Sequence, residues 1–294
     1  MADVSIPTRT TSILGIGFDS SRHLTVKFNN LNPLNGLSMD EIEIYELKKI
    51  DLRDAVVIDG FPSVGLVSSI VANYLIALLK LEYIAVMDSN LFPTVSLIRD
   101  SEPLGPARVY ARPHLKDGEQ QVVVFSTELQ PSANLLRPIG TAIIEYAVKQ
   151  RCKLVISAGG LIVEREEGEP DENRGEIAVY GIGSTEAAQQ LLMSADAEPF
   201  IEGVISGTAG VLLNEGKRRG VDVITLLAEA RPEMADARAA ALILAAIDQM
   251  ILHLNLNVEP LCKEAEGLEA QLKVLHKDAQ KKSKGQSPDV AGYY

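Results

Sequence analysis

Residues 59–67 form the first of three glycine-containing segments that could bind a ligand. They read Asp-Gly-Phe-Pro-Ser-Val-Gly-Leu-Val and follow a run of apolar residues. Ligands of open α/β sheets bind where a buried strand enters a glycine turn and a helix, because the backbone can approach and the helix N-terminus favours an anion. Gly60 and Gly65 have the spacing of a phosphate loop, but Leu66-Val67 stands where Lys-Ser or Lys-Thr is needed. We therefore expect no nucleoside triphosphate site, and a tight turn alone also explains the glycines.

The second segment contains Gly159-Gly160 and is followed by a run of acidic residues. These are Glu164, Glu166, Glu167, Glu169, Asp171 and Glu172. Carboxylates are ligands for hard cations, but the spacing is not that of a calcium loop and no histidine joins them. Arg165 and Arg174 lie in the same run. We expect a solvated acidic loop and no metal site.

The third segment contains Ser206-Gly207, at the start of a predicted helix. Small residues there let the helix begin close to a neighbouring element or a ligand. The loop residues that we single out as candidate ligand or oligomer contacts are Gly60, Phe61, Pro62, Gly65, Gly159, Gly160, Ser206 and Gly207. The four histidines are scattered along the chain, and no Ser–His–Asp grouping is indicated.

The residues Gly292, Tyr293 and Tyr294 follow a segment rich in Lys, Ser, Gly, Gln and Pro. Such a composition cannot bury enough apolar area to fold, so we expect residues 283–294 to be a flexible tether. A tyrosine offers an apolar body with a polar tip, and a terminal carboxylate can be bound by backbone amides or a lysine. The segment is thus a candidate docking tail, although a frayed terminus without a role is the alternative.

Short apolar runs alternate with longer helical patterns, which predicts a parallel or mixed sheet between helices. The predicted strands are Ala55–Asp59, Tyr83–Met87, Arg108–Arg112, Gln121–Thr127, Lys153–Ala158, Ile177–Tyr180 and Asp222–Ala228. The predicted helices are Val64–Lys80, Asn134–Gln150, Thr185–Met193, Thr208–Arg219 and Asp236–Leu254. We expect a three-layer α/β/α sandwich over residues 49–256.

Two further segments precede the tail. Residues 1–48 form an N-terminal extension, in which turn residues between two apolar runs favour a small hairpin. Residues 257–282 carry leucine and alanine at alternating spacings of four and three, which predicts a C-terminal helix with a short heptad seam. That seam is equally suited to packing on its own domain and to the core of an oligomer.

The formal charge of −12 opposes binding to nucleic acid or to an anionic membrane, since both attract lysine and arginine. Gly60–Leu79 is uncharged and about long enough to span a bilayer, but glycines and a proline interrupt its first third. Cys152 and Cys262 are distant in sequence and form no disulfide framework, and no signal peptide is visible. We expect a cytoplasmic protein without a membrane span.

Three blocks of the sequence resemble the proteasome assembly chaperone family, found in archaea and related to the eukaryotic proteasome assembly chaperone 2. The first block comprises residues 59–67 with residues 72–76, where Ser63 replaces a glycine that is common in the family. The second comprises residues 207–213 with Gly220, and the third comprises residues 226–229 with Pro232, Asp236, Ala239 and Ala240. The resemblance covers about residues 50–275.

This resemblance implies a fold similar to that of nucleoside phosphorylases, no known enzymatic activity, no cofactor and a homo-oligomer. Some archaeal members end in a hydrophobic-Tyr-any signature that enters pockets between α subunits of the 20S proteasome. Tyr293 and Tyr294 match its last two positions, whereas Gly292 departs from the hydrophobic one. Glycine buries almost no apolar area, so docking would then depend on several tails binding together or on Tyr294.

Three functions remain open from the sequence. The leading hypothesis is a non-enzymatic chaperone that binds proteasome α subunits or their ring. The second is a small-molecule-binding or phosphorylase-like enzyme acting on nucleosides, suggested by the fold class and the glycine turns. The third is a purely structural oligomer held together by the C-terminal helix.

Overall fold

A computed structural model describes residues 42–258, except 117, 163–177 and 233, together with residue 261. Clustering of the backbone divides the chain into residues 1–38 and 39–294, and all described residues fall in the second unit. The predicted N-terminal hairpin, nearly all of the C-terminal helix and the tail lie outside the described residues.

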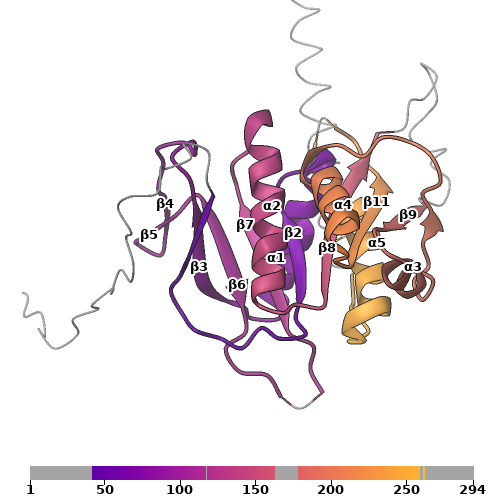
Figure 1. Cartoon of the computed structure of the whole chain (residues 1–294), viewed down its shortest axis with the longest axis horizontal. Coiled ribbons are helices and arrows are strands. Elements are labelled where there is room, and N and C mark those ends of the chain that lie inside the picture. The colour runs from indigo at the N-terminus through magenta and orange to yellow at the C-terminus, as the bar shows by residue number, and fades with distance from the viewer. Residues whose placement is uncertain (1–41, 117, 163–177, 233, 259–260, 262–294) are drawn as a thin grey trace, which may run out of the picture. The chain divides into compact units, whose positions relative to one another are not determined.

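A mixed sheet forms the centre of this unit, with the strand order β1-β3-β6-β7-β2-β8-β11-β9-β10 (Figure 1). Its middle is parallel and consists of β7 (Val122–Thr127), β2 (Val56–Gly60), β8 (Leu154–Leu161) and β11 (Val223–Glu229). Every residue of β2 and β7 is buried, as expected for strands covered on both faces. The parallel middle explains why the sequence shows continuous apolar runs there instead of alternation.

Antiparallel strands extend the sheet on both sides. On one side lie β6 (Ala107–Ala111), β3 (Glu82–Asp88) and β1 (Glu43–Glu46), each antiparallel to its neighbour. On the other side β9 (Val179–Gly183) runs antiparallel to β11 and pairs with β10 (Glu198–Pro199). The strands β4 (Leu97–Arg99) and β5 (Glu102–Leu104) form a separate hairpin.

Helices cover both faces of the sheet. On one face pack α1 (Val67–Leu78), α3 (Glu186–Leu192) and α5 (Ala237–Ile247), and their apolar side chains form one core cluster with Val56 and Ile58. On the other face α2 (Ala133–Lys149) and α4 (Gly207–Arg219) lie side by side (Figure 1) and cover Val57 and Phe125. The predicted three-layer α/β/α sandwich is thereby confirmed.

Three details differ from the sequence prediction. The sheet begins before residue 49, because β1 pairs with β3 from inside the segment predicted as an extension. Short strands β4, β5 and β10 were missed, since two or three residues carry no periodic signal. The last predicted helix is α-helical only as far as Ile247 and continues directly as a π-helical turn, Asp248–Leu252.

Helix ends agree with the local sequence. Thr185 caps α3 by accepting a hydrogen bond from the backbone N–H of Ala188 at 3.1 Å. Asp236 caps α5 in the same way through Ala239. Gly220 ends α4 in the left-handed conformation, where glycine carries no steric penalty.

Candidate functional site

A cavity of about 480 Å³ opens where the parallel strands β2 and β8 end, beside the start of α4. Five of the eight loop residues predicted from the sequence line it: Pro62, Gly159, Gly160, Ser206 and Gly207. They come from three segments of the chain that the parallel strands and α4 bring to one edge of the sheet. These three segments therefore line one cavity of ligand size.

The other three predicted residues do not line this cavity. Gly60 is the last residue of β2, and a Cβ there would lie 2.4 Å from the carbonyl oxygen of Phe125. Phe61 is buried and lines a separate cavity of about 130 Å³. Gly65 has a left-handed φ of 62° and accepts a hydrogen bond from the backbone N–H of Asp236. Gly60, Gly65 and the buried ring of Phe61 thus determine the path of the loop between β2 and α1.

Close packing explains one of the lining glycines. A Cβ at Gly160 would lie 2.4 Å from the carbonyl oxygen of Val64, so the loop after β2 passes directly over β8. Gly207 is different: it has a left-handed φ of 74°, and no atom lies within 4 Å of its Cβ position. The first glycine is required by packing and the second by backbone conformation.

In the loop after β2, two serine side chains form hydrogen bonds with each other and with backbone groups of the loop. The backbone N–H of Ser68 donates to the Ser63 hydroxyl oxygen at 3.2 Å, and the Ser68 hydroxyl donates to the carbonyl of Phe61. The Ser63 hydroxyl in turn donates to the Ser68 hydroxyl oxygen at 3.0 Å. The Ser68 amide near the start of α1 is therefore already bonded and does not face a ligand.

A buried carboxylate beneath the cavity was not found from the sequence. Asp59 is 1% exposed and accepts three hydrogen bonds: from the backbone N–H of Phe61 at 3.1 Å and from the hydroxyls of Ser157 and Thr208, each at 2.8 Å. Burial raises the pKa of Asp59, while these three donors oppose the rise. The available signal was an acidic residue inside an otherwise apolar strand, Val-Val-Ile-Asp.

The cavity suits a neutral polar group better than a phosphate. The start of α4 faces it, and the N-cap residue Ser206 makes no side-chain cap, so helix amides remain there as donors. The hydroxyl protons of Ser157 and Thr208 point to Asp59, which leaves their oxygens as acceptors. None of the described lining residues is charged and none is a histidine. The described lining thus offers hydrogen bonds without a cation for phosphate or a general base.

Exposed apolar side chains surround this edge. Ile201 and Val204, on the loop before α4, are 91% and 90% exposed, and Ile162 at the end of β8 is more than half exposed. Val204 and Ile162 also line the cavity. Grouped apolar side chains with such exposure mark protein contact sites more often than chance placement does. The sequence offered little indication of this exposed apolar surface, since isolated apolar residues in a loop have no periodicity.

The remaining predicted sites cannot be placed. Gly292, Tyr293, Tyr294 and the acidic residues 164–172 lie outside the described residues. Within the described part of the chain, no group of three or more His, Cys, Asp or Glu is arranged to hold a metal. No helix among the described residues combines the length and apolarity that a membrane span needs.

Comparison with known proteins finds one family model and several solved structures. The PAC2 family model matches residues 57–276. The crystal structure of Pyrococcus furiosus PbaA, described as an archaeal homolog of proteasome-assembly chaperone, is 31% identical, covers 83% of this chain and 95% of its own, and has a TM-score of 0.69. Pyrococcus furiosus PbaB, described as an archaeal proteasome activator, is 25% identical, covers 81% of this chain and 100% of its own, and has a TM-score of 0.68. An uncharacterized protein of Methanocaldococcus jannaschii is 29% identical over 81% of this chain and 92% of its own.

Proposed function

The chain belongs to the PAC2 family, and from this premise we propose that it is a non-enzymatic proteasome assembly chaperone or core-particle-binding protein. The observation that carries the proposal is the similarity to PbaA, at 31% identity over 95% of that chain. The similarity to an archaeal proteasome activator supports the same class of partner. No chemical step is required, because a chaperone stabilises whichever assembly state it binds more tightly.

The contact with the proteasome is assigned in this proposal to the segment Gly292-Tyr293-Tyr294, which docks between α subunits. Tyrosine supplies the apolar area and the polar tip that such a pocket contacts. Gly292 contributes almost no buried area, so a single segment binds weakly. A homo-oligomer that presents several copies raises the overall affinity by avidity, and we include such an oligomer in the proposal.

The folded body offers a second surface for the same partner or for self-association. Ile201 and Val204 are almost fully exposed, and Val204 lines the cavity at the carboxyl ends of the strands. Burying these two side chains on binding removes apolar area from water at roughly 25 cal/mol per Å². A contact there would explain why two large apolar side chains point into solvent.

A pull-down of 20S core particle and of free α subunits, read by native mass spectrometry, tests the proposal. The full chain is compared with a version that ends at Ala291 and with a Tyr293→Ala variant. We expect the full chain to capture one of the two species and both altered proteins to capture less, with unchanged circular dichroism and oligomer mass. Capture that does not depend on residues 292–294 would move the contact to the folded body. Capture of neither species would overturn the proposal.

A nucleoside-binding function is the second candidate, favoured by the cavity of about 480 Å³ at the edge where α/β folds bind ligands. The uncharged described lining weighs against a phosphorylase, because phosphate binding calls for cationic side chains. Thermal unfolding with nucleosides, phosphate and nucleotides tests it. A ligand at a hundred times its dissociation constant stabilises the fold by about 2.7 kcal/mol, so absence of any shift would eliminate this candidate.

A further inference from the structure

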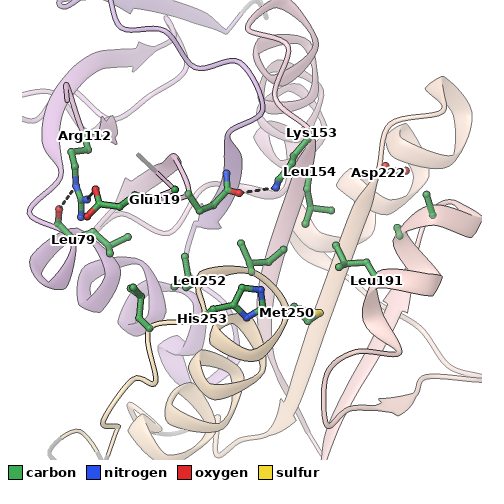
Figure 2. A pocket seen from close by; sticks show the side chains of 16 residues that line it. Leu79, Arg112, Glu119, Lys153, Leu154, Leu191, Asp222, Met250, Leu252 and His253 are labelled. Atoms are coloured by element: carbon green, nitrogen blue, oxygen red, sulfur yellow. Dashed lines mark hydrogen bonds and ion pairs between the residues drawn. The ribbon is translucent and has the colours of Figure 1, made fainter. Parts of the chain in front are cut away.

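A second and larger cleft, of about 810 Å³, lies at the opposite edge of the sheet, where the parallel strands begin (Figure 2). Leu154 is the first residue of β8, and Asp222 directly precedes β11. The volume is within the range of roughly 300–1,000 Å³ that small-molecule sites occupy. Nothing in the proposed proteasome contact uses this cleft.

One wall of the cleft is apolar. Leu79 comes from the end of α1, Leu191 from α3, and Met250 and Leu252 from the π-helical turn, and Figure 2 shows them around the same space. Leu254, which follows the turn, is half exposed at its margin. Three helical elements thus provide a surface for a hydrocarbon group.

The segment that carries His253 and Leu254 is held in place by a buried carboxylate. Asp248 accepts hydrogen bonds from the backbone N–H groups of Leu254 and Leu256, each at 2.8 Å. His253 itself has a left-handed φ of 52° and donates its backbone N–H to the carbonyl of Asp248 at 2.8 Å. π-Helical turns occur frequently at functional sites, and here the turn directs an imidazole and a leucine to the cleft.

The other wall carries two cationic side chains, Arg112 and Lys153, and only the first forms an ion pair with a described carboxylate. Arg112 donates to the carbonyl of Leu79 at 3.0 Å and forms an ion pair with Glu119, so its charge is already neutralised. Lys153 donates to the side-chain oxygen of Gln120 at 2.6 Å, which is a neutral partner. No carboxylate of a described residue forms an ion pair with Lys153. Figure 2 shows Lys153 directed away from Asp222.

Asp222 also lines the cleft, but its carboxylate already has a hydrogen-bond partner. It accepts a hydrogen bond from the hydroxyl of Thr185, the N-cap of α3. Among the described lining residues, Lys153 therefore offers an ammonium group and His253 an imidazole to a ligand, and the apolar wall belongs to the same cleft. One available positive charge matches a single negative charge, which a carboxylate has and a phosphate dianion exceeds.

We propose that this cleft binds a small monocarboxylate with a hydrocarbon chain, whose carboxylate contacts Lys153 and His253 and whose chain lies on Leu191, Met250 and Leu252. The carboxylate gains a charge-assisted hydrogen bond from the ammonium group. Each buried methylene contributes about 0.8 kcal/mol, so affinity rises with chain length until the apolar wall is covered.

Isothermal titration of the full protein with octanoate, compared with octanamide, tests the proposal. Octanamide has the same chain without the charge, so we expect it to bind at least about tenfold more weakly. Lys153→Met keeps the apolar stem and removes the charge, and we expect a similar loss for octanoate. Lys149→Met, an exposed lysine on α2 that does not line the cleft, is the matched control and leaves the affinity unchanged.

Backbone amide shifts in a nuclear magnetic resonance titration locate the ligand. We expect octanoate to shift the amides of residues 252–254 and those next to Lys153. Absence of octanoate binding at millimolar concentration, equal binding of octanamide, or equal affinity of both lysine variants would each overturn the proposal. Proteasome capture is measured separately, so failure of one proposal leaves the other intact.

Discussion

Asp59 connects three elements that are distant in sequence. Its carboxylate lies on β2 and accepts hydrogen bonds from Ser157 on β8 and Thr208 on α4. It also accepts from the backbone N–H of Phe61, in the loop that borders the cavity. A buried carboxylate is costly unless its oxygens are paired, so the three donors are needed for Asp59 to remain in the core. The same contacts hold the floor of the cavity.

Replacing Asp59 with alanine removes the acceptor for three buried donors. Each unpaired buried donor costs about 1–3 kcal/mol, and partial rearrangement leads us to expect a loss of roughly 2–4 kcal/mol in the free energy of unfolding. Urea denaturation of the variant and of the unchanged protein measures this loss. Asp51→Ala removes an exposed carboxylate that pairs with the neighbouring Arg53, and we expect it to leave the unfolding midpoint unchanged. Equal effects of the two variants would show that the network does not stabilise the fold.

Cys152 is predicted to react slowly with alkylating reagents in the folded protein. It packs against the apolar cluster beside Leu52, and burial raises its pKa to about 12, compared with an ordinary value of about 8.5. Since the thiolate is the reactive form, labelling by iodoacetamide at pH 8 should be at least about tenfold slower than for a free cysteine. Peptide mapping by mass spectrometry separates Cys152 from Cys262. Unfolding in urea should abolish the protection, and fast labelling of the native protein would contradict the prediction.

At the scale of elements, the loop between β2 and α1 and the strand β8 approach each other without space for a side chain. The carbonyl of Val64 lies over Gly160, while the Cβ position of Gly159 meets only the end of the Leu227 side chain, at 2.9 Å. A terminal methyl group can move at low cost, but a backbone carbonyl cannot. Neighbouring glycines in one strand therefore have different structural roles.

The pair Gly160→Ala and Gly159→Ala tests this difference. We expect Gly160→Ala to displace the loop from β8 and to lower the free energy of unfolding by about 1–3 kcal/mol or more, as overpacked core positions do. Gly159→Ala should lower the free energy of unfolding by clearly less, because the Leu227 side chain can adopt another rotamer. Thermal unfolding of the two variants side by side measures the difference. A larger loss for Gly159→Ala would be evidence against the close approach at Gly160.

At the scale of the whole molecule, the second unit has an apolar core on both faces of its sheet. The two apolar clusters, one on each face of the sheet, are built from residues 52–251, with Val258 and Leu261 packed against one of them. The heptad seam predicted beyond residue 261 is one candidate surface for contacts between copies of the chain. The exposed residues Ile201 and Val204 are the alternative surface for such contacts.

A chain that ends at Leu261 separates these two explanations of self-association. We expect it to keep its thermal midpoint within a few degrees, because it retains the residues of both clusters, and to lose only the circular dichroism signal of the predicted C-terminal helix. If the C-terminal segment holds the oligomer, light scattering will show a monomer. An unchanged oligomer would contradict the predicted role of the heptad seam. Ile201→Ser combined with Val204→Ser would then be expected to dissociate it.

The periodic signals of the sequence were sufficient for the layers of the fold. Every predicted strand and helix of residues 50–254 has a counterpart in the structure, because fully buried parallel strands and amphipathic helices impose long apolar patterns. Short edge strands and the π-helical turn were missed. Pairing with β3 decides that Glu43–Glu46 is a strand, and its four residues contain no such pattern.

The glycine segments and the family were determined by the sequence alone, since a left-handed turn or a close backbone contact requires a particular residue at a particular position. Tertiary structure decided which of those segments share a cavity, and it revealed the bonds of Asp59 to residues 98 and 149 positions away. It also placed Lys153 and His253 at one cleft although 100 residues separate them. The physical reason is the distance along the chain over which each interaction acts. Steric limits on the backbone act between neighbouring residues, whereas these hydrogen bonds and charges act between atoms that only the folded sheet brings together.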